Sequence, residues 1–216
     1  MRSFTPPGAP GRCPRCLLLA EYCVCGFIGA PRLHRPEILI VRHQWEAWKS
    51  TGTARVAQLA LANLRIIDMA PENPEPVRAT LAALEDAWLL YPGRESAERL
   101  ATPPRTLVVL DGTWRQTRKM LRRLPELSRL PRFALESPAP EGALSRLREA
   151  PDPSARSTLE SIAAALGRLH TPELGHELLT VHRHFVQQTR LARGQRVAEA
   201  ADAVPSTEPG HFRQRA

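Results

Sequence analysis

The sequence predicts an α/β fold in which a mostly parallel sheet is covered by helices on both faces. Short apolar runs of strand length alternate with segments in which apolar residues recur at helical spacing. The apolar runs are nearly continuous, as expected for strands buried on both faces of a sheet. A chain of 216 residues is also long enough to bury one large core without disulfide bonds. In such sheets a ligand lies beyond the carboxyl ends of the strands.

The first strand–helix–strand unit begins with the apolar run at residues 37–41. A helix is expected over residues 53–63, where apolar residues such as Val56 and Ala60 recur one helical turn apart, and a second strand follows over 64–68.

A helix over residues 77–86 then leads to a strand over 88–91, which a Pro-Gly pair ends. The most strongly predicted strand covers residues 106–110 and stops at Asp111. The remaining elements expected are a helix over 113–124, a strand over 132–136, and helices over 157–169 and 173–193.

The predicted organisation has four parts. They are a disordered start over residues 1–12, a metal-binding knuckle over 13–30, a main domain over 31–194 and a disordered tail over 195–216. No apolar run approaches the roughly 20 residues that a membrane helix needs. The N-terminus also lacks the apolar centre of a secretory signal. A cytoplasmic protein with no membrane partner is therefore expected, and we expect it to be a monomer.

The charge balance favours a nucleic-acid partner. Lys and Arg number 30 against 22 Asp and Glu, giving a net charge of +8. Only Lys49 and Lys119 are lysines, and arginine is well suited to bidentate phosphate recognition. The alternative is arginine-rich codon usage, which raises the net charge without any partner.

The cysteines form one cluster, Cys13-x2-Cys16-x6-Cys23-x-Cys25, with none elsewhere in the chain. In a chain expected in the cytosol, this clustering favours a metal over disulfides. Four thiolates suit a closed tetrahedral zinc site that holds a small loop in place. The alternatives are an iron–sulfur cluster, although the spacing is shorter than in the usual ferredoxin runs, redox-active thiols, or no metal at all.

The end of the strand at 106–110 is a candidate site. Asp111 follows the strand, Gly112 leaves room for a ligand, and Thr113 is placed to cap the next helix. The alternative is that Asp111 only ends the strand and Trp114 only fills the core.

The helix that starts there carries four cations on one stripe. They repel one another unless an anion faces them, and a phosphate backbone fits that requirement. A solvated helix face is the alternative. The stripe consists of Arg115, Arg118, Lys119 and Arg122.

Two further segments offer hydrogen-bond donors near a helix start. Residues 43–55 follow a strand and are rich in hydroxyl groups, so that donors converge at a positive helix end. In this segment His43 and Glu46 are interpreted as a structural pair rather than as metal ligands. Ser157 and Glu160 form a capping-box pattern, whose amides and hydroxyls either only cap the helix or also face a ligand.

Taken in order, these segments resemble the DTW-domain family. In one departure, Gly52 stands where members commonly carry Asn, which removes one polar contact from the first loop. The matching motifs are the cysteine cluster, His43-x2-Glu46-x2-Lys49-Ser50-Thr51-x-Thr53-x-Arg55, Leu90-Tyr91-Pro92-Gly93, Asp111-Gly112-Thr113-Trp114 and Ser157-Thr158-Leu159-Glu160.

The resemblance implies a tRNA-uridine aminocarboxypropyltransferase. Such an enzyme moves the 3-amino-3-carboxypropyl group of S-adenosylmethionine to N3 of a uridine in tRNA and releases methylthioadenosine. It also implies a fold related to the SPOUT methyltransferases, with a knotted C-terminal part. The alternatives are a SPOUT-like RNA methyltransferase and a non-catalytic protein that binds zinc and RNA.

The resemblance also suggests roles for individual residues. Asp111 is expected to be the general base that takes the uridine proton, or to hold the amino group of the donor. The donor would be bound by Tyr91, Pro92, Gly93, Leu110, Gly112, Thr113, Trp114, Ser157 and Thr158. The tRNA would be bound by Lys49, Thr51, Thr53, Arg55, Arg115, Arg118 and Lys119, and structural zinc by Cys13, Cys16, Cys23 and Cys25.

Overall fold

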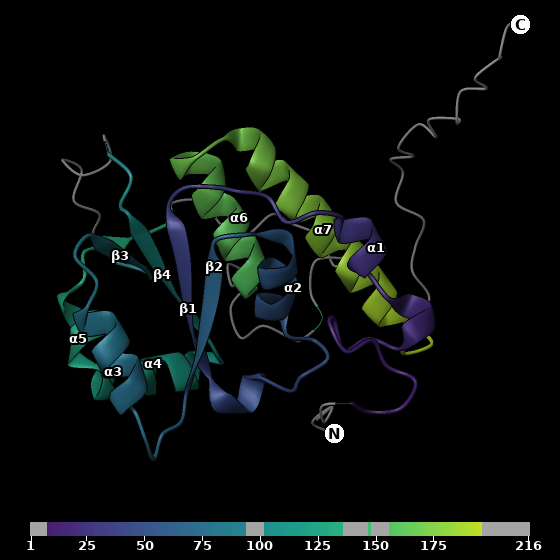
Figure 1. Ribbon diagram of the computed structural model, residues 1–216, viewed down its shortest axis with the longest axis horizontal. Helices are drawn as coiled ribbons and strands as arrows, with labels where there is room; N and C mark the ends of the chain where they lie inside the picture. Colours follow the sequence, from purple (N-terminus) through teal and green to yellow (C-terminus); the bar gives the residue numbers. More distant parts are fainter. Residues whose placement is uncertain (1–7, 94–101, 136–146, 148–155, 196–216) are drawn as a thin grey trace, which may run out of the picture.

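The computed structural model describes residues 8–93, 102–135, 147 and 156–195. Its centre is a five-stranded sheet in the order β2-β1-β4-β3-β5, in which every pair of neighbouring strands is parallel (Figure 1). The strands are β1 (Glu37–His43), β2 (Leu64–Met69), β3 (Ala87–Leu90), β4 (Thr106–Asp111) and β5 (Arg132–Phe133). The predicted α/β class with a parallel sheet is confirmed.

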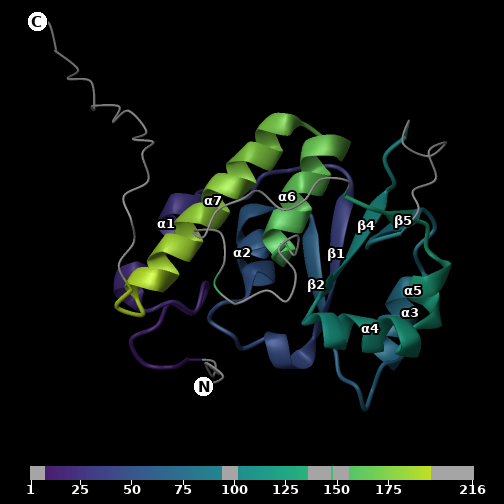
Figure 2. The same ribbon diagram turned by 180° about the vertical axis from the view of Figure 1, so that it is seen from behind.

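Helices cover both faces of the sheet, as the sequence predicted. Figures 1 and 2 show α3, α4 and α5 on one face and α2, α6 and α7 on the other. The helices are α2 (Thr53–Ala60), α3 (Glu75–Ala82), α4 (Trp114–Arg123), α5 (Pro125–Arg129), α6 (Thr158–Leu169) and α7 (Pro172–Leu191).

Successive side chains of the central strands pack alternately into two separate hydrophobic cores. Leu107 and Val109 of β4 pack in the core shared with α2, α6 and α7, whereas Val108 packs with α3, α4 and α5. A strand buried on both faces needs apolar residues at nearly every position, which explains the continuous apolar runs in the sequence. Because the strands are parallel, their carboxyl ends lie at one edge, where Arg42 of β1 is in register with Asp111 of β4.

The structure differs from the prediction at several element boundaries, and the helix expected over 77–86 is α3, which starts at Glu75 and ends at Ala82. The helix expected over 113–124 stops at Arg123 and a separate helix, α5, starts at Pro125, because proline has no backbone N–H and disfavours a helical residue before it. Leu61 adopts an extended conformation and ends α2 at Ala60 rather than at residue 63. The strand expected over 132–136 is limited to β5, and residue 136 lies outside the described residues.

The N-terminal knuckle packs against the last helix. It contains a 3-10 helix, η1 (Ala20–Tyr22), and the short helix α1 (Cys25–Ile28). Val24 and Ile28 join the core that contains α2, α6 and α7. The Phe27 ring stacks on His184 of α7, with centroids 4.0 Å apart.

The knuckle begins before residue 13. Gly11 accepts a hydrogen bond of 2.9 Å from the backbone of Ala20, and the Arg12 guanidinium donates to the Leu17 carbonyl at 2.9 Å. The remainder of the predicted disordered start (residues 1–7) and of the predicted tail (196–216) lies outside the described residues. Among the helices that the structure describes, none is long and apolar enough to cross a membrane.

Candidate active site and nucleic-acid interface

Asp111 and Thr158, far apart in the sequence, meet at the carboxyl edge of the sheet. Thr158 Oγ1 donates a hydrogen bond of 2.6 Å to Asp111 Oδ1. Asp111 is 8% exposed, so its carboxylate is held in a fixed, largely desolvated position. The structure thus brings together the Asp-Gly-Thr-Trp motif at the end of β4 and the Ser-Thr-Leu-Glu motif at the start of α6.

The start of α6 is stabilised by a capping box and a buried histidine. Ser157 Oγ accepts from the backbone N–H of Glu160 at 3.2 Å, and Glu160 accepts from the backbone N–H of Ser157 at 2.8 Å. Ser157 Oγ also lies 3.0 Å from Nε2 of His182 on α7, in a hydrogen bond. Burial lowers the pKa of His182, although the Glu160 carboxylate opposes the shift. The capping interpretation of this motif is confirmed, and His182 is a contact that the sequence analysis missed.

The start of α4 lies close to the end of β1. Thr113 caps α4 in a capping box with Gln116, whose side chain also lies 3.4 Å from His43 Nδ1. A Cβ on Gly112 would come within 3.2 Å of the Gln116 Cβ and 3.6 Å of the His43 Cβ. Glycine at this position therefore allows the β4–α4 turn to pack against the β1 end.

Aromatic residues extend the site toward β3. Tyr91 follows β3, and its ring meets Trp114 edge-on with centroids 6.2 Å apart. Trp114 is 40% exposed, so it does not fill the core as the alternative interpretation held. Tyr91, Trp114 and Asp111 therefore lie at neighbouring strand ends, as the carboxyl-edge prediction required.

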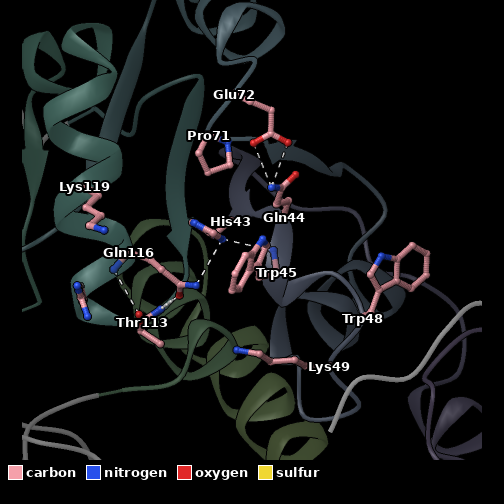
Figure 3. Close-up of a pocket in the computed structure, with 11 residues that line it drawn as sticks. His43, Gln44, Trp45, Trp48, Lys49, Pro71, Glu72, Thr113, Gln116 and Lys119 are labelled. Atoms are coloured by element: carbon pink, nitrogen blue, oxygen red, sulfur yellow. Dashed lines mark hydrogen bonds between the residues drawn. The ribbon is translucent and has the colours of Figure 1, made fainter. Parts of the chain in front are cut away.

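A pocket of about 900 Å³ opens at the same edge, between the ends of β1, β2 and β4 (Figure 3). Two of its tryptophans are exposed to solvent, Trp45 by 61% and Trp48 by 36%. The lining comprises His43 at the end of β1, Gln44, Trp45, Trp48 and Lys49 after it, Pro71 and Glu72 after β2, and Thr113, Arg115, Gln116 and Lys119 at and after the start of α4.

The residues predicted to bind RNA divide into an exposed and an inner group. Arg115, Arg118 and Lys119 are exposed on α4, and Lys49, which lines the pocket with Arg115 and Lys119, is half-buried in an ion pair with Glu46. The inner group holds the loop in place instead: Thr51 and Thr53 are buried, Thr53 Oγ1 accepts from the backbone of Leu159, and Arg55 donates to the carbonyl of Ala47. Direct contact with RNA thus remains a proposal for the exposed group.

Most pocket residues were missed as ligand-binding residues by the sequence analysis, because the pocket forms from three loops that are distant in the sequence. The sequence did contain one signal for this pocket, the pair Trp45 and Trp48 in a polar loop directly after a buried strand. The interpretation of His43 and Glu46 as structural fits the contacts: His43 accepts from the Trp45 backbone, and Glu46 is buried with Lys49 as its ion-pair partner.

The four cysteines form a metal-binding constellation. Their sulfur atoms all lie within 4.8 Å of one another, with Cys13 and Cys25 at 3.7 Å and Cys16 and Cys23 at 3.8 Å. A tetrahedral site with Zn–S bonds of about 2.3 Å places sulfur atoms about 3.8 Å apart, so the donor set fits zinc. Burial opposes ionisation of Cys13, but hydrogen bonds from the backbone at Cys16 and Arg15 lower its pKa to about 7.

The fold and site together define a parallel α/β protein with a knuckle whose four cysteines are close enough to hold a metal ion, and with a polar site at the carboxyl edge of its sheet. The chain belongs to the DTW domain family, whose profile matches residues 11–190, which confirms the resemblance found in the sequence.

Two curated relatives carry the same name, tRNA-uridine aminocarboxypropyltransferase 2. The Drosophila melanogaster protein is 30% identical over 188 residues, which cover 82% of this chain and 74% of the relative. The Macaca fascicularis protein is 27% identical over 168 residues, which cover 73% of this chain but only 56% of the relative. No solved structure matches the chain significantly.

Proposed function

We propose that the protein transfers the 3-amino-3-carboxypropyl group of S-adenosylmethionine to N3 of a uridine in tRNA. The single observation that carries the proposal is the hydrogen bond between buried Asp111 and Thr158 at the carboxyl edge, in a chain whose relatives bear the name of this activity. In the reaction, a bond forms between N3 and the side-chain carbon of the donor. The bond from that carbon to sulfur breaks, and methylthioadenosine leaves with the electron pair.

Asp111 is proposed to accept the N3 proton, which leaves nitrogen as the new bond forms. The sulfonium of the donor already activates the carbon, so the protein mainly has to orient the correct S–C bond and remove one proton. The hydrogen bond from Thr158 fixes the orientation of the carboxylate for this role. In the second proposed role, Asp111 holds the donor's ammonium group instead.

The donor would lie along the strand ends around Asp111. The edge contact between Tyr91 and Trp114 and the turn at Gly112 support this placement, because these residues follow the neighbouring strands β3 and β4, and β4 ends at Asp111. The proposed donor-binding residues remain Tyr91, Pro92, Gly93, Leu110, Gly112, Thr113, Trp114, Ser157 and Thr158.

Structural zinc and a knotted C-terminal part complete the proposal. The knuckle is proposed to hold one zinc ion through its four cysteines, in a role that organises the fold and leaves no position open for catalysis. The proposed knot would involve the return of the chain from β5, at the sheet edge, to Thr158 beside β4. Most of that connection lies outside the described residues.

Nucleoside mass spectrometry after incubation of tRNA with the protein and S-adenosylmethionine tests the function. The expected products are aminocarboxypropyluridine and methylthioadenosine in equal amounts. Methylated nucleosides with adenosylhomocysteine would instead identify a methyltransferase. Binding of tRNA with no nucleoside product and no donor binding by calorimetry would identify a non-catalytic RNA-binding protein.

A further inference from the structure

The pocket next to the proposed transfer site is separate from Asp111 and has a different chemistry. Asp111 faces Thr158 on α6 and does not line the pocket. The pocket presents Trp45, whose side chain is 61% exposed and meets His43 edge-on (Figure 3). An aromatic surface of this size in an open pocket suits a flat, partly apolar ligand.

Charges divide the pocket into two sides. Arg115 and Lys119 supply positive charge on one side, whereas the charge of Lys49 is paired with the Glu46 carboxylate. On the other side Gln44 Nε2 donates to both oxygens of Glu72, at 3.3 and 3.4 Å. The Glu72 carboxylate disfavours an anion beside it, so a phosphate would lie toward the cations and an uncharged ring toward Trp45. A nucleotide has this distribution of charge.

We propose that this pocket binds an unpaired nucleotide of the tRNA, directly next to the uridine that is modified, with its base stacked on Trp45. The proposal rests on the proposed function, which supplies tRNA as the substrate. The modified uridine itself must present N3 to Asp111, and that carboxylate lies outside the pocket. A neighbouring nucleotide can occupy the pocket at the same time, because Thr113 at its rim is only two residues from Asp111. Holding this neighbour unstacked from the uridine would expose the Watson–Crick edge of the uridine.

The test compares tRNA binding by Trp45→Ala, Trp45→Phe and the unsubstituted protein, by fluorescence anisotropy of labelled tRNA over a range of salt concentrations. Trp45→Ala should weaken binding roughly tenfold, the scale of one base–aromatic stack. Its salt dependence should be unchanged, since no phosphate contact is lost. Trp45→Phe should recover most of the affinity. Leu33→Ala, which truncates a side chain that is 80% exposed outside the pocket, is the matched control.

Calorimetry with S-adenosylmethionine separates this inference from the proposed function. The inference predicts donor affinity close to normal in Trp45→Ala. Unchanged tRNA affinity in Trp45→Ala would overturn it while leaving the transfer reaction intact, and a large loss of donor affinity would assign the pocket to the donor instead. If Trp45→Ala loses tRNA affinity tenfold but the unsubstituted protein makes no aminocarboxypropyluridine, the nucleotide pocket is supported and the proposed function is refuted.

Discussion

Two neighbouring regions at the carboxyl edge of the sheet are built in opposite ways. Around Asp111 the groups are buried and connected by hydrogen bonds to α6, whereas the pocket beside it is open, aromatic and cationic. A group that exchanges a proton at one defined atom needs a fixed position, while a surface that receives a flexible polyanion needs exposed charge. Under the proposed function, chemistry and RNA capture belong to different side chains, so that substitutions should separate them.

Asp111→Asn should give the largest effect. The substitution is nearly isosteric and its amide oxygen can still accept from Thr158, so the fold should be retained. Transfer should fall roughly 10²-fold or more, as expected for loss of a general base. The measurement is initial-rate kinetics of aminocarboxypropyluridine formation.

Binding measurements on the same variant sharpen the comparison. Affinity for tRNA should stay normal. Donor affinity should stay normal if Asp111 is the base, and should fall if Asp111 holds the donor's ammonium. Transfer at the unsubstituted rate would return Asp111 to the role of a residue that only ends a strand.

Charge reversal on α4 tests the other region. Changing Arg115, Arg118 and Lys119 together to Glu should weaken tRNA binding at least tenfold and lower the slope of log affinity against log salt by up to about 3. Donor affinity should change little.

The matched control reverses Arg35, Arg65 and Arg105, three exposed arginines at the amino ends of β1, β2 and β4, on the opposite edge of the sheet. It makes the same change in net charge. Equal weakening by the two triple variants would mean that total charge, and not the face of α4, controls binding.

Metal removal is expected to affect the stability of the protein more than it affects group transfer or tRNA binding directly. Protein purified without added metal should contain about one zinc per chain by elemental analysis. Cys13→Ser should lose the metal and lower Tm, because the knuckle contributes Val24 and Ile28 to the main core. A metal-free protein with full stability and activity would rule out a structural zinc site.

The smallest expected effect is a dependence of stability on pH from His182. Burial lowers its pKa below the ordinary value of 6.5, so between the two values the unfolded chain binds more protons than the folded one. The free energy of unfolding should therefore decrease as pH falls below about 6.5, by at most about 1.4 kcal/mol per pH unit from this group. Urea denaturation between about pH 7.5 and 5.5 should show a shallower slope for His182→Gln. An identical slope would show that other groups, such as the similarly shifted His34, account for the dependence.

The sheet could be predicted from the sequence because its signals are local. The run at 106–110 is apolar at consecutive positions because both faces of β4 are buried. Because the strands are parallel, Asp111 at the end of β4 lies at the carboxyl edge of the sheet, where a ligand was expected. The knuckle was predictable for a similar reason, because its four cysteines are close in the chain.

The contacts that complete the site could not be predicted, because they depend on tertiary packing. Thr158 meets Asp111 across 47 residues, and His182 approaches Ser157 from a different helix. The burial of Thr51 and Thr53 is of the same kind. From the sequence these hydroxyl residues were predicted to contact RNA, yet packing buries both of them, and Thr53 accepts a hydrogen bond at the start of α6.

The docking of the knuckle on α7 has a consequence for the order of events during synthesis. The cysteines at positions 13–25 leave the ribosome before the surface that covers them, residues 172–191, has been made. Phe27 therefore has no His184 to stack on until nearly the whole domain has been translated. Binding of the proposed metal can close the small loop early, but the loop is buried against the core only after α7 has been made. Folding of the N-terminal region therefore depends on synthesis of α7.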